Sequence, residues 1–187
     1  EAMRVHATYD NYNSRCGALI VLASAPLDVE LVVLEVAVSG TANRNMGLVA
    51  PDMSVITNIG TAHLKPGQTT LETARKKSSL FQHMKPGATA IICRDTEHFD
   101  FMADRARVAG LSILTYGEHP ESDIRLAGYC LEEGVVAAVI AGEQVSYKLS
   151  VPGRHMAVNS LVCLAVARTI RLDHQVLHQG FAKTSAM

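Results

Sequence analysis

The chain has no tryptophan, few other aromatic residues (5% in all) and only six prolines among its 187 residues. Its formal net charge is −1, from 17 basic and 18 acidic side chains. A surface without excess charge of one sign offers no broad electrostatic attraction for nucleic acid or an anionic membrane. No apolar run approaches the roughly 20 residues of a membrane-spanning helix. We therefore expect no nucleic acid and no membrane among the partners.

The spacing of the four cysteines argues against a zinc site and a disulfide framework. The four cysteines, Cys16, Cys93, Cys130 and Cys163, are far apart, form no C-x-x-C pair and lie in apolar segments. A zinc site or a disulfide framework would need a clustered pattern. The N-terminal residues also lack the pattern of a signal peptide. We expect reduced, structural cysteines in a cytoplasmic protein.

Aliphatic residues supply most of the apolar content. Hydrophobic residues make up 48% of the chain, which suits one sizeable α/β domain built from valine, isoleucine, leucine and alanine. The run from Leu31 to Val38 predicts a parallel strand that is buried on both faces. Glu35 interrupts this run, and a buried carboxylate is costly unless it is paired or binds a metal. A Mg²⁺ ligand and a core ion pair are equal alternatives for Glu35.

The stretch from Asp52 to Met84 carries the most informative sequence pattern of the chain. It predicts a short buried strand between Pro51 and Gly60, a loop that carries His63, and then an amphipathic helix. In open α/β sheets, ligands bind beyond the carboxyl ends of the strands. The arrangement therefore suits a divalent metal and a phosphate-rich ligand near His63.

The helix of this stretch places a lysine toward the core. On a helical wheel of about 100° per residue, Lys77 falls about 240° from Leu71, inside the apolar arc. A lysine in that position must extend its amine to solvent, pair with an acid or lose its charge. Thr69 or Thr70 is expected to cap the helix, with Glu72 in its first turn. The arc itself is formed by Ala74, Leu80, Phe81 and Met84.

The remaining segments alternate between strands and helices. Thr89 to Cys93, Glu97 to Ala109 and Ser112 to Tyr116 have the strand–helix–strand order of parallel crossovers. Hairpin signals at Glu133-Gly134 and Gly142-Glu143 then predict a small antiparallel sheet of three strands. Its strands are expected at Asp123–Leu131, Val135–Ile140 and Gln144–Leu149, and helices are expected at Met156–Ile170 and from about Asp173 to Ala182.

Two loop segments carry polar residues with open roles. Glu1 to Pro26 is predicted to be a loop that leads into a helix. Asn11 and Asn13 in it could contact a ligand, but asparagine is common in turns, and the turn interpretation is favoured. Arg44 could likewise reach a phosphate, although solvent is the more frequent partner of such a side chain.

Several motifs occur together in an order that resembles the central ATP-binding domain of the Mur ligase family. Those enzymes join an amino acid or peptide to a carboxylate through an acyl phosphate. The resemblance covers nearly all of residues 1–187, and it implies a P-loop-type, mostly parallel sheet flanked by helices. Folylpolyglutamate and cyanophycin synthetases carry related domains. The motifs are LEV (Leu34–Val36), TNIGTAHL (Thr57–Leu64), ARKKSSLF (Ala74–Phe81) and VPGRHMAVNSLVCLAVA (Val151–Ala167).

One further segment points to a branch of the family. TYDNYNSRCG, from Thr8 to Gly17, is similar to a segment of the ligases that add D-alanyl-D-alanine to a UDP-N-acetylmuramoyl tripeptide. The resemblance therefore implies peptidoglycan precursor synthesis, with a UDP-linked muramoyl peptide or a similar carboxylate as one substrate. An amino acid or a dipeptide would be the other.

The resemblance also implies roles for single residues. Glu35 resembles the glutamate that holds a Mg²⁺ bridging the ATP phosphates, and His63 matches the histidine that binds a second Mg²⁺. Lys77 matches a lysine that the family carries as a carbamate, an acidic group that contacts the second metal. Carbamylation requires a neutral amine, which a partly buried lysine can supply.

The nucleotide would be contacted by a second group of residues. Asn58 lies beside the metal loop, and His155 and Asn159 match a GRHNxxN-type motif near the adenine. Met156 stands where that motif has its first asparagine, which removes one polar contact.

The phosphate loop of the family, a G-x-x-G-K-[ST]-like sequence, does not occur in the chain. A glycine-rich turn of this kind cradles phosphates at a helix N-terminus. By the resemblance it would lie just before Glu1, and the flanking substrate and C-terminal domains are missing too. We therefore expect a partial central domain that is inactive alone.

Two other interpretations stay open. The chain could be a ligase-derived domain kept for scaffolding or regulation, which Met156 and the missing loop favour. It could also be an unrelated α/β binding domain in which Glu35, His63 and Lys77 are structural and lie far apart.

Overall fold

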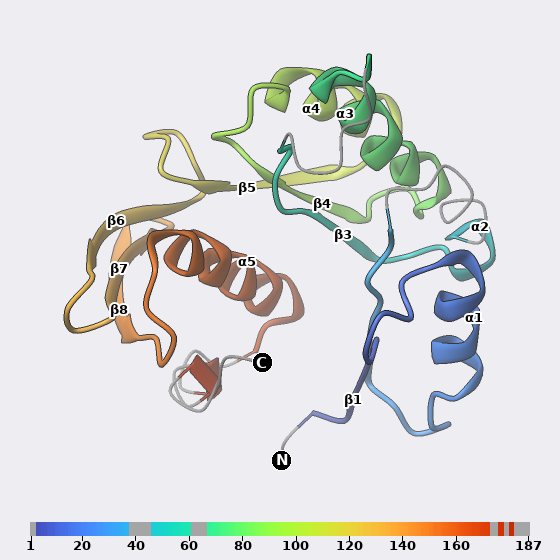
Figure 1. Ribbon diagram of the computed structural model, residues 1–187, viewed down its shortest axis with the longest axis horizontal. Coiled ribbons are helices and arrows are strands. Elements are labelled where there is room, and N and C mark those ends of the chain that lie inside the picture. Colours follow the sequence, from blue (N-terminus) through green and yellow to red (C-terminus); the bar gives the residue numbers. More distant parts are fainter. Residues whose placement is uncertain (1–2, 38–45, 61–66, 173–175, 178–179, 182–187) are drawn as a thin grey trace.

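The computed structural model describes residues 3–37, 46–60, 67–172, 176–177 and 180–181. Their strands form two sheets, one of two strands and one of six (Figure 1). Within these ranges, no helix combines the length and the apolar character needed to cross a bilayer.

The two-stranded sheet lies in the N-terminal part of the chain. β1 (Val5–Ala7) pairs in parallel with β2 (Leu31–Val33), and α1 (Arg15–Ala23) connects them. The expected helix is thus confirmed, whereas β1 was not predicted. The predicted strand from Leu31 to Val38 is wrong in length and burial, because β2 ends at Val33, whose side chain is 48% exposed. In the described ranges β2 has β1 as its one strand neighbour, so it lacks the cover of a central strand.

The larger sheet begins with three parallel strands, as the strand–helix–strand pattern predicted. β4 lies between β3 and β5. Helices α3 and α4 lie together on one side of these strands, and the short α2 lies near the start of β3 (Figure 1). The strands are β3 (Met53–Ile56), β4 (Thr89–Cys93) and β5 (Ser112–Gly117), and the helices are α2 (Met46–Val49), α3 (Thr70–Ser78), the 3-10 turn η2 (Ser79–His83) and α4 (Phe99–Val108).

Three antiparallel strands continue the same sheet. The sequence predicted them as a small sheet, and the structure adds that the first one is joined to β5. Tyr116 and Gly117 of β5 pair in parallel with Ile124 and Arg125. α5 lies on the side of the sheet opposite α3 and α4 (Figure 1). These elements are β6 (Ile124–Cys130), β7 (Val135–Ile140), β8 (Glu143–Lys148) and α5 (Arg154–Ile170).

Strand β4 divides the hydrophobic core into two clusters. Successive side chains of a strand point to opposite faces. Ile91 and Cys93 pack with the cluster under α5, and Ala90 and Ile92 pack with the cluster under α3 and α4. All four are buried, so β4 has the two-sided burial typical of a parallel strand between helices.

The last predicted helix, from about Asp173 to Ala182, lies largely outside the described residues. Its described part, residues 176–177 and 180–181, is helical. Phe181 is buried against Tyr147 of β8, with ring centroids 4.6 Å apart.

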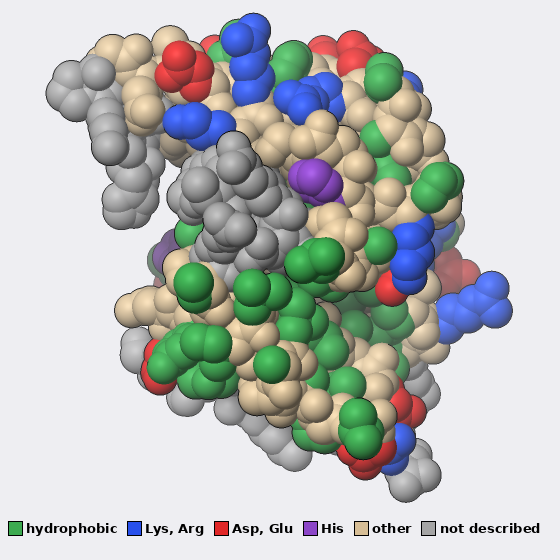
Figure 2. All heavy atoms as spheres, turned by 90° about the vertical axis from the view of Figure 1, so that its right-hand side faces the viewer, with side chains coloured by type: hydrophobic (Ala, Val, Ile, Leu, Met, Phe, Trp, Pro, Cys, Tyr) green, Lys and Arg blue, Asp and Glu red, His purple; other side chains and the backbone are tan. Residues whose placement is uncertain are grey.

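Hydrophobic side chains also gather on one outer face. In Figure 2 they cover the lower half of the molecule, where α1 and the two-stranded sheet lie. Large exposed side chains on this part of the chain include Tyr12, Leu19, Ile20, Leu27 and Val33.

Candidate functional site

The candidate site lies where β3, β4 and β5 end. These strands are parallel, so their carboxyl ends meet at one edge of the sheet. Thr57 and Asn58 follow β3, and Asp95 follows β4. The buried Tyr116 of β5 donates a hydrogen bond from its hydroxyl to the carbonyl oxygen of Thr57, at 2.7 Å, which fixes the end of β3. This edge is where ligands bind in open α/β sheets.

Lys77 reaches this edge from α3. Thr69 caps the helix and Glu72 lies in its first turn, as the sequence predicted, and the structure adds that the two form a capping box by accepting from each other's backbone N–H groups. Ala74 of α3 and Phe81 of η2 are buried, and Lys77 is half-buried. Its Nζ donates a hydrogen bond to the carbonyl oxygen of Asn58, at 2.9 Å. The inward position that the wheel predicted for Lys77 is therefore confirmed.

The environment of Lys77 disfavours its charged form relative to water. No ion pair of Lys77 occurs among the described residues. Burial lowers the pKa of the Lys77 amine, because removal from water disfavours the charged ammonium. A neutral amine can act as a nucleophile, whereas an ammonium cannot.

Asn58 follows the end of β3 and accepts the hydrogen bond from Lys77. Besides accepting from Lys77, it accepts a hydrogen bond at its own Oδ1 from the backbone N–H of Ile59, at 2.7 Å. Its side chain is exposed at the strand end. His63 falls outside the described residues, so its predicted role stays a prediction.

Glu35 lies two residues beyond the end of β2 and is exposed. Its Oε1 accepts a hydrogen bond from Asn13 Nδ2 at 3.0 Å, and its backbone N–H donates to Thr8 Oγ1 at 2.9 Å. No ion pair of Glu35 occurs in the described part of the chain, so the core ion pair is not seen there. The expected cost of a carboxylate in a buried strand does not arise, because Glu35 is outside the strand.

The donor chemistry at Glu35 fits Mg²⁺. This ion prefers oxygen ligands and takes one or two carboxylates together with water and substrate phosphates. An exposed carboxylate that accepts one hydrogen bond from a neutral amide leaves oxygen lone pairs open for such an ion. Across the described ranges, no group of three or more His, Cys, Asp or Glu side chains is placed to hold a metal ion. A metal at Glu35 would therefore need ligands beyond these residues, such as phosphate oxygens.

His155 and Asn159 lie in the first turns of α5. They are four residues apart and both exposed, so they share one face of the helix. Arg154 donates two hydrogen bonds to the Glu118 carboxylate, at 2.9 and 2.5 Å, and this contact raises the pKa of the Arg154 guanidinium. The pair ties the start of α5 to the loop after β5 and sets where His155 and Asn159 lie.

The loop after β5 is held by a residue that the sequence analysis missed. The Asp95 carboxylate accepts hydrogen bonds from the backbone N–H groups of Glu118 and His119, at 2.7 and 2.8 Å. Gly117 has φ +145°, and a Cβ there would overlap that carboxylate. The signal available in the sequence was an aspartate directly after a buried strand and a glycine at the end of the next one.

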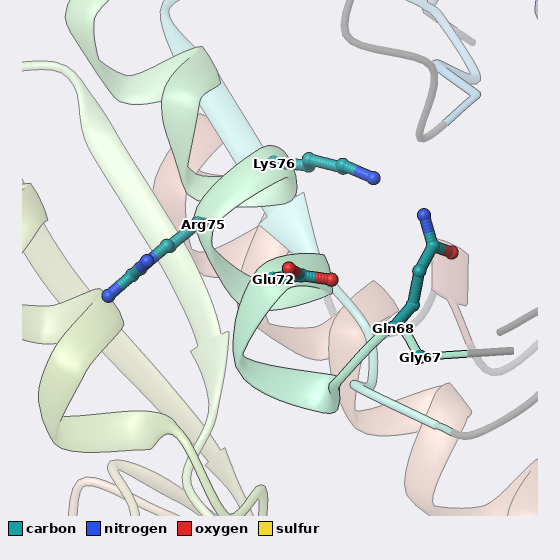
Figure 3. A pocket seen from close by; sticks show the side chains of 5 residues that line it. All are labelled: Gly67, Gln68, Glu72, Arg75 and Lys76. Atoms are coloured by element: carbon teal, nitrogen blue, oxygen red, sulfur yellow. The ribbon is translucent and has the colours of Figure 1, made fainter. Parts of the chain in front are cut away.

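A shallow hollow of about 360 Å³ lies on the outer side of α3. In Figure 3 the side chains of Lys76 and Gln68 extend toward each other across it, Glu72 lies between them, and Arg75 points away. The guanidinium of Arg75 lies 6.0 Å from the ring centre of Phe101. Among the described residues, none that was predicted for the site lines this hollow.

The chain is similar to proteins of known family. The sequence profile of the Mur ligase middle domain matches residues 1–167. The UDP-N-acetylmuramoyl-tripeptide–D-alanyl-D-alanine ligase of Synechocystis sp. is 31% identical over 183 residues, which is 94% of the chain and 37% of that enzyme. The chain thus spans less than half the length of this relative.

Solved structures share the fold. MurF from Acinetobacter baumannii superposes with a TM-score of 0.89 at 21% identity, over 99% of the chain and 41% of that protein. The MurF ligase from Thermotoga maritima, solved in complex with ADP, superposes with a TM-score of 0.79, also at 21% identity, over 99% of the chain and 43% of that protein. At these identities the likeness establishes a common architecture.

Proposed function

Because the chain belongs to the Mur ligase family, we propose that it forms the ATP-binding part of a ligase that joins an amine to a carboxylate. The observation that carries the proposal is Lys77, half-buried at the end of β3 with its amine on the Asn58 carbonyl. Its lowered pKa favours the neutral amine that carbamylation needs. A structural lysine of an unrelated domain would not need this environment.

In the proposed reaction, a carboxylate oxygen of one substrate attacks the γ-phosphorus of ATP. The bond from that phosphorus to the β,γ-bridging oxygen breaks, which releases ADP and leaves an acyl phosphate. The amine of the second substrate then attacks the acyl carbon, phosphate leaves, the amine loses a proton to a base or to solvent, and an amide forms. Catalysis of this kind rests on positioning and on neutralising the phosphate charges.

The residues of the chain would divide this work. Glu35 would hold one Mg²⁺, and His63 and carbamylated Lys77 would hold a second. Bound Mg²⁺ would neutralise phosphate charge as it develops. Carbamylation forms a bond between Lys77 Nζ and the carbon of CO₂ and releases one proton. Asn58, His155 and Asn159 would contact the nucleotide along the strand-end edge.

The substrate class follows the relatives. The printed name of the Synechocystis enzyme gives a UDP-N-acetylmuramoyl tripeptide and D-alanyl-D-alanine as what it joins. We propose a UDP-linked muramoyl peptide and a dipeptide or amino acid for the protein to which this chain belongs. Both ATP and such a precursor place the reaction in the cytoplasm, in peptidoglycan synthesis.

The experiment that tests this proposal is ¹³C NMR of the chain in ¹³C-bicarbonate buffer. A carbamate resonance should appear in the wild type and disappear in Lys77→Arg, because a guanidinium is always protonated and does not add CO₂. Lys76→Arg is the matched control on the exposed side of the same helix turn, and it should keep the resonance. Absence of the resonance in the wild type, or its persistence in Lys77→Arg, would remove the main support for the proposed chemistry.

A further inference from the structure

The side chain that holds Glu35 comes from a segment with no role in the proposed reaction. Asn13 lies 22 residues before Glu35 in the chain, and its Nδ2 donates to Glu35 Oε1 at 3.0 Å. The sequence favoured a simple turn residue at this position. The observed contact shows instead that the Asn13 side chain reaches across to the residue that follows β2.

Hydrogen bonds also hold the backbone at Asn13. Its carbonyl oxygen accepts a hydrogen bond from the backbone N–H of Ala37 at 2.9 Å. The next residue, Ser14, is the N-cap of α1, and its hydroxyl oxygen accepts from the Gly17 N–H at 3.2 Å. The backbone of Asn13 therefore cannot shift freely, and its amide presents a donor at a set position.

Glu35 is held at two points by the same segment. Its backbone N–H donates to the hydroxyl oxygen of Thr8, and its carboxylate accepts from Asn13. A carboxylate has about four lone-pair sites, so one amide contact leaves Oε2 and further sites available. A neutral amide also orients the group without neutralising it, which an arginine or lysine at this position would do.

We propose that Asn13 is a positioning residue that aims the Glu35 carboxylate at a divalent cation. The proposal rests on the proposed role of Glu35 as a metal ligand and extends it to a residue that does not touch the ion. Hydrogen-bond partners of ligating side chains typically change metal affinity by about 10- to 100-fold when they are removed.

The test is titration of the 187-residue chain with Mn²⁺, a paramagnetic substitute for Mg²⁺, in the presence of ADP, whose phosphate oxygens supply the further ligands that a metal at Glu35 needs. Binding is followed by electron paramagnetic resonance. Glu35→Gln should abolish the binding seen in the wild type. Asn13→Ala should weaken it by about tenfold or more. Asn11→Ala, in the same loop, is the matched control and should bind as the wild type does. Asn13→Leu keeps the bulk of the side chain without the donor and should match Asn13→Ala.

The outcomes separate this inference from the proposed function. If Glu35→Gln loses Mn²⁺ while both Asn13 variants bind like the wild type, the positioning role is wrong and the metal role of Glu35 stands. If Glu35→Gln binds like the wild type, both are wrong. A purely structural role for Asn13 predicts a lower melting temperature with unchanged affinity, so thermal unfolding is measured on the same samples, and that pattern also overturns the inference.

Discussion

At the scale of single residues, Lys77 is a lysine that is partly removed from water without an acidic partner among the described residues. It is half-buried, and its hydrogen bond goes to a neutral carbonyl, that of Asn58, which does not offset its charge. Burial lowers its pKa, so at a given pH a larger fraction of Lys77 is neutral than of an exposed lysine. The acid–base chemistry of Lys77 therefore depends on the fold.

The pH dependence of carbamylation follows from this shift. The ammonium form does not react with CO₂, so the carbamate of Lys77 should be lost as the pH falls through its pKa. Because that pKa lies below the ordinary lysine value of 10.5, the signal should persist to lower pH than the carbamate of a free lysine side chain. A ¹³C NMR series over pH measures this, with Nα-acetyl-lysine as the reference compound. Equal pH profiles for Lys77 and the reference compound would contradict the shift.

Gly153 is a second residue whose local geometry affects the stability of the fold. It has φ +148°, a region that L-residues rarely occupy, and a Cβ there would lie 2.9 Å from the ring of His155. Gly153→Ala should therefore lower the free energy of unfolding by about 1–3 kcal/mol, measured by urea denaturation.

Gly128→Ala is the control for Gly153→Ala. Gly128 lies in β6 without a positive φ, and its nearest new contact would be the Cβ of Ala137 at 3.9 Å. If Gly128→Ala lowers the free energy of unfolding as much as Gly153→Ala does, the positive φ of Gly153 is not the cause of the loss of stability.

At the scale of elements, α3 owes its start to the capping box. Thr69 Oγ1 accepts from the Glu72 N–H at 3.2 Å, and the Glu72 carboxylate accepts from the Thr69 N–H. Thr69→Ala should lower the free energy of unfolding by about 1 kcal/mol. It should also loosen Lys77, since the helix carries that residue to the strand end.

Thr73→Ala is the control for the cap. Thr73 lies inside the same helix, where alanine is the better helix former, so this variant should be neutral or slightly stabilising. Urea denaturation compares the two variants, and equal losses would contradict the capping role of Thr69.

Elements with strong local signals were predictable from the sequence. Thr89 to Cys93 was predicted with the observed bounds, because a short apolar run that contains β-branched residues carries its own signal. β1 was missed because three residues give no periodicity and its pairing with Leu31 depends on a distant segment. The length of β2 was overestimated for a related reason, since burial depends on which neighbours cover a strand.

Of the candidate site, the sequence predicted the feature that depends on local spacing and missed the contacts between distant residues. Helical spacing alone placed Lys77 on the inner side of α3. The contacts of Asn13 with Glu35 and of Asp95 with the loop after β5 were not predictable, because each joins residues more than 20 positions apart through side-chain geometry. No periodicity or short motif encodes such a contact.

At the scale of the whole molecule, the six-stranded sheet has the edge at which we propose that a nucleotide binds, but the 187 residues contain no G-x-x-G-K-[ST] sequence. Backbone N–H groups of such a loop normally cradle the phosphates. We predict that this 187-residue polypeptide does not turn over ATP, measured as phosphate release in the presence of Mg²⁺. Steady release that exceeds a Glu35→Gln control would contradict this prediction.

The most direct test of the account is a ¹H–¹⁵N NMR titration of the chain with Mg²⁺·ADP. We expect shifts to concentrate at the carboxyl ends of β3 to β5 and the start of α5, at Asn58, Lys77, His155 and Asn159. The same shifts should be weaker in Glu35→Gln, because the ion would lose its ligand from the protein. Shifts confined to the hollow on the outer side of α3, or no shifts with saturating nucleotide, would contradict a nucleotide site at the strand ends.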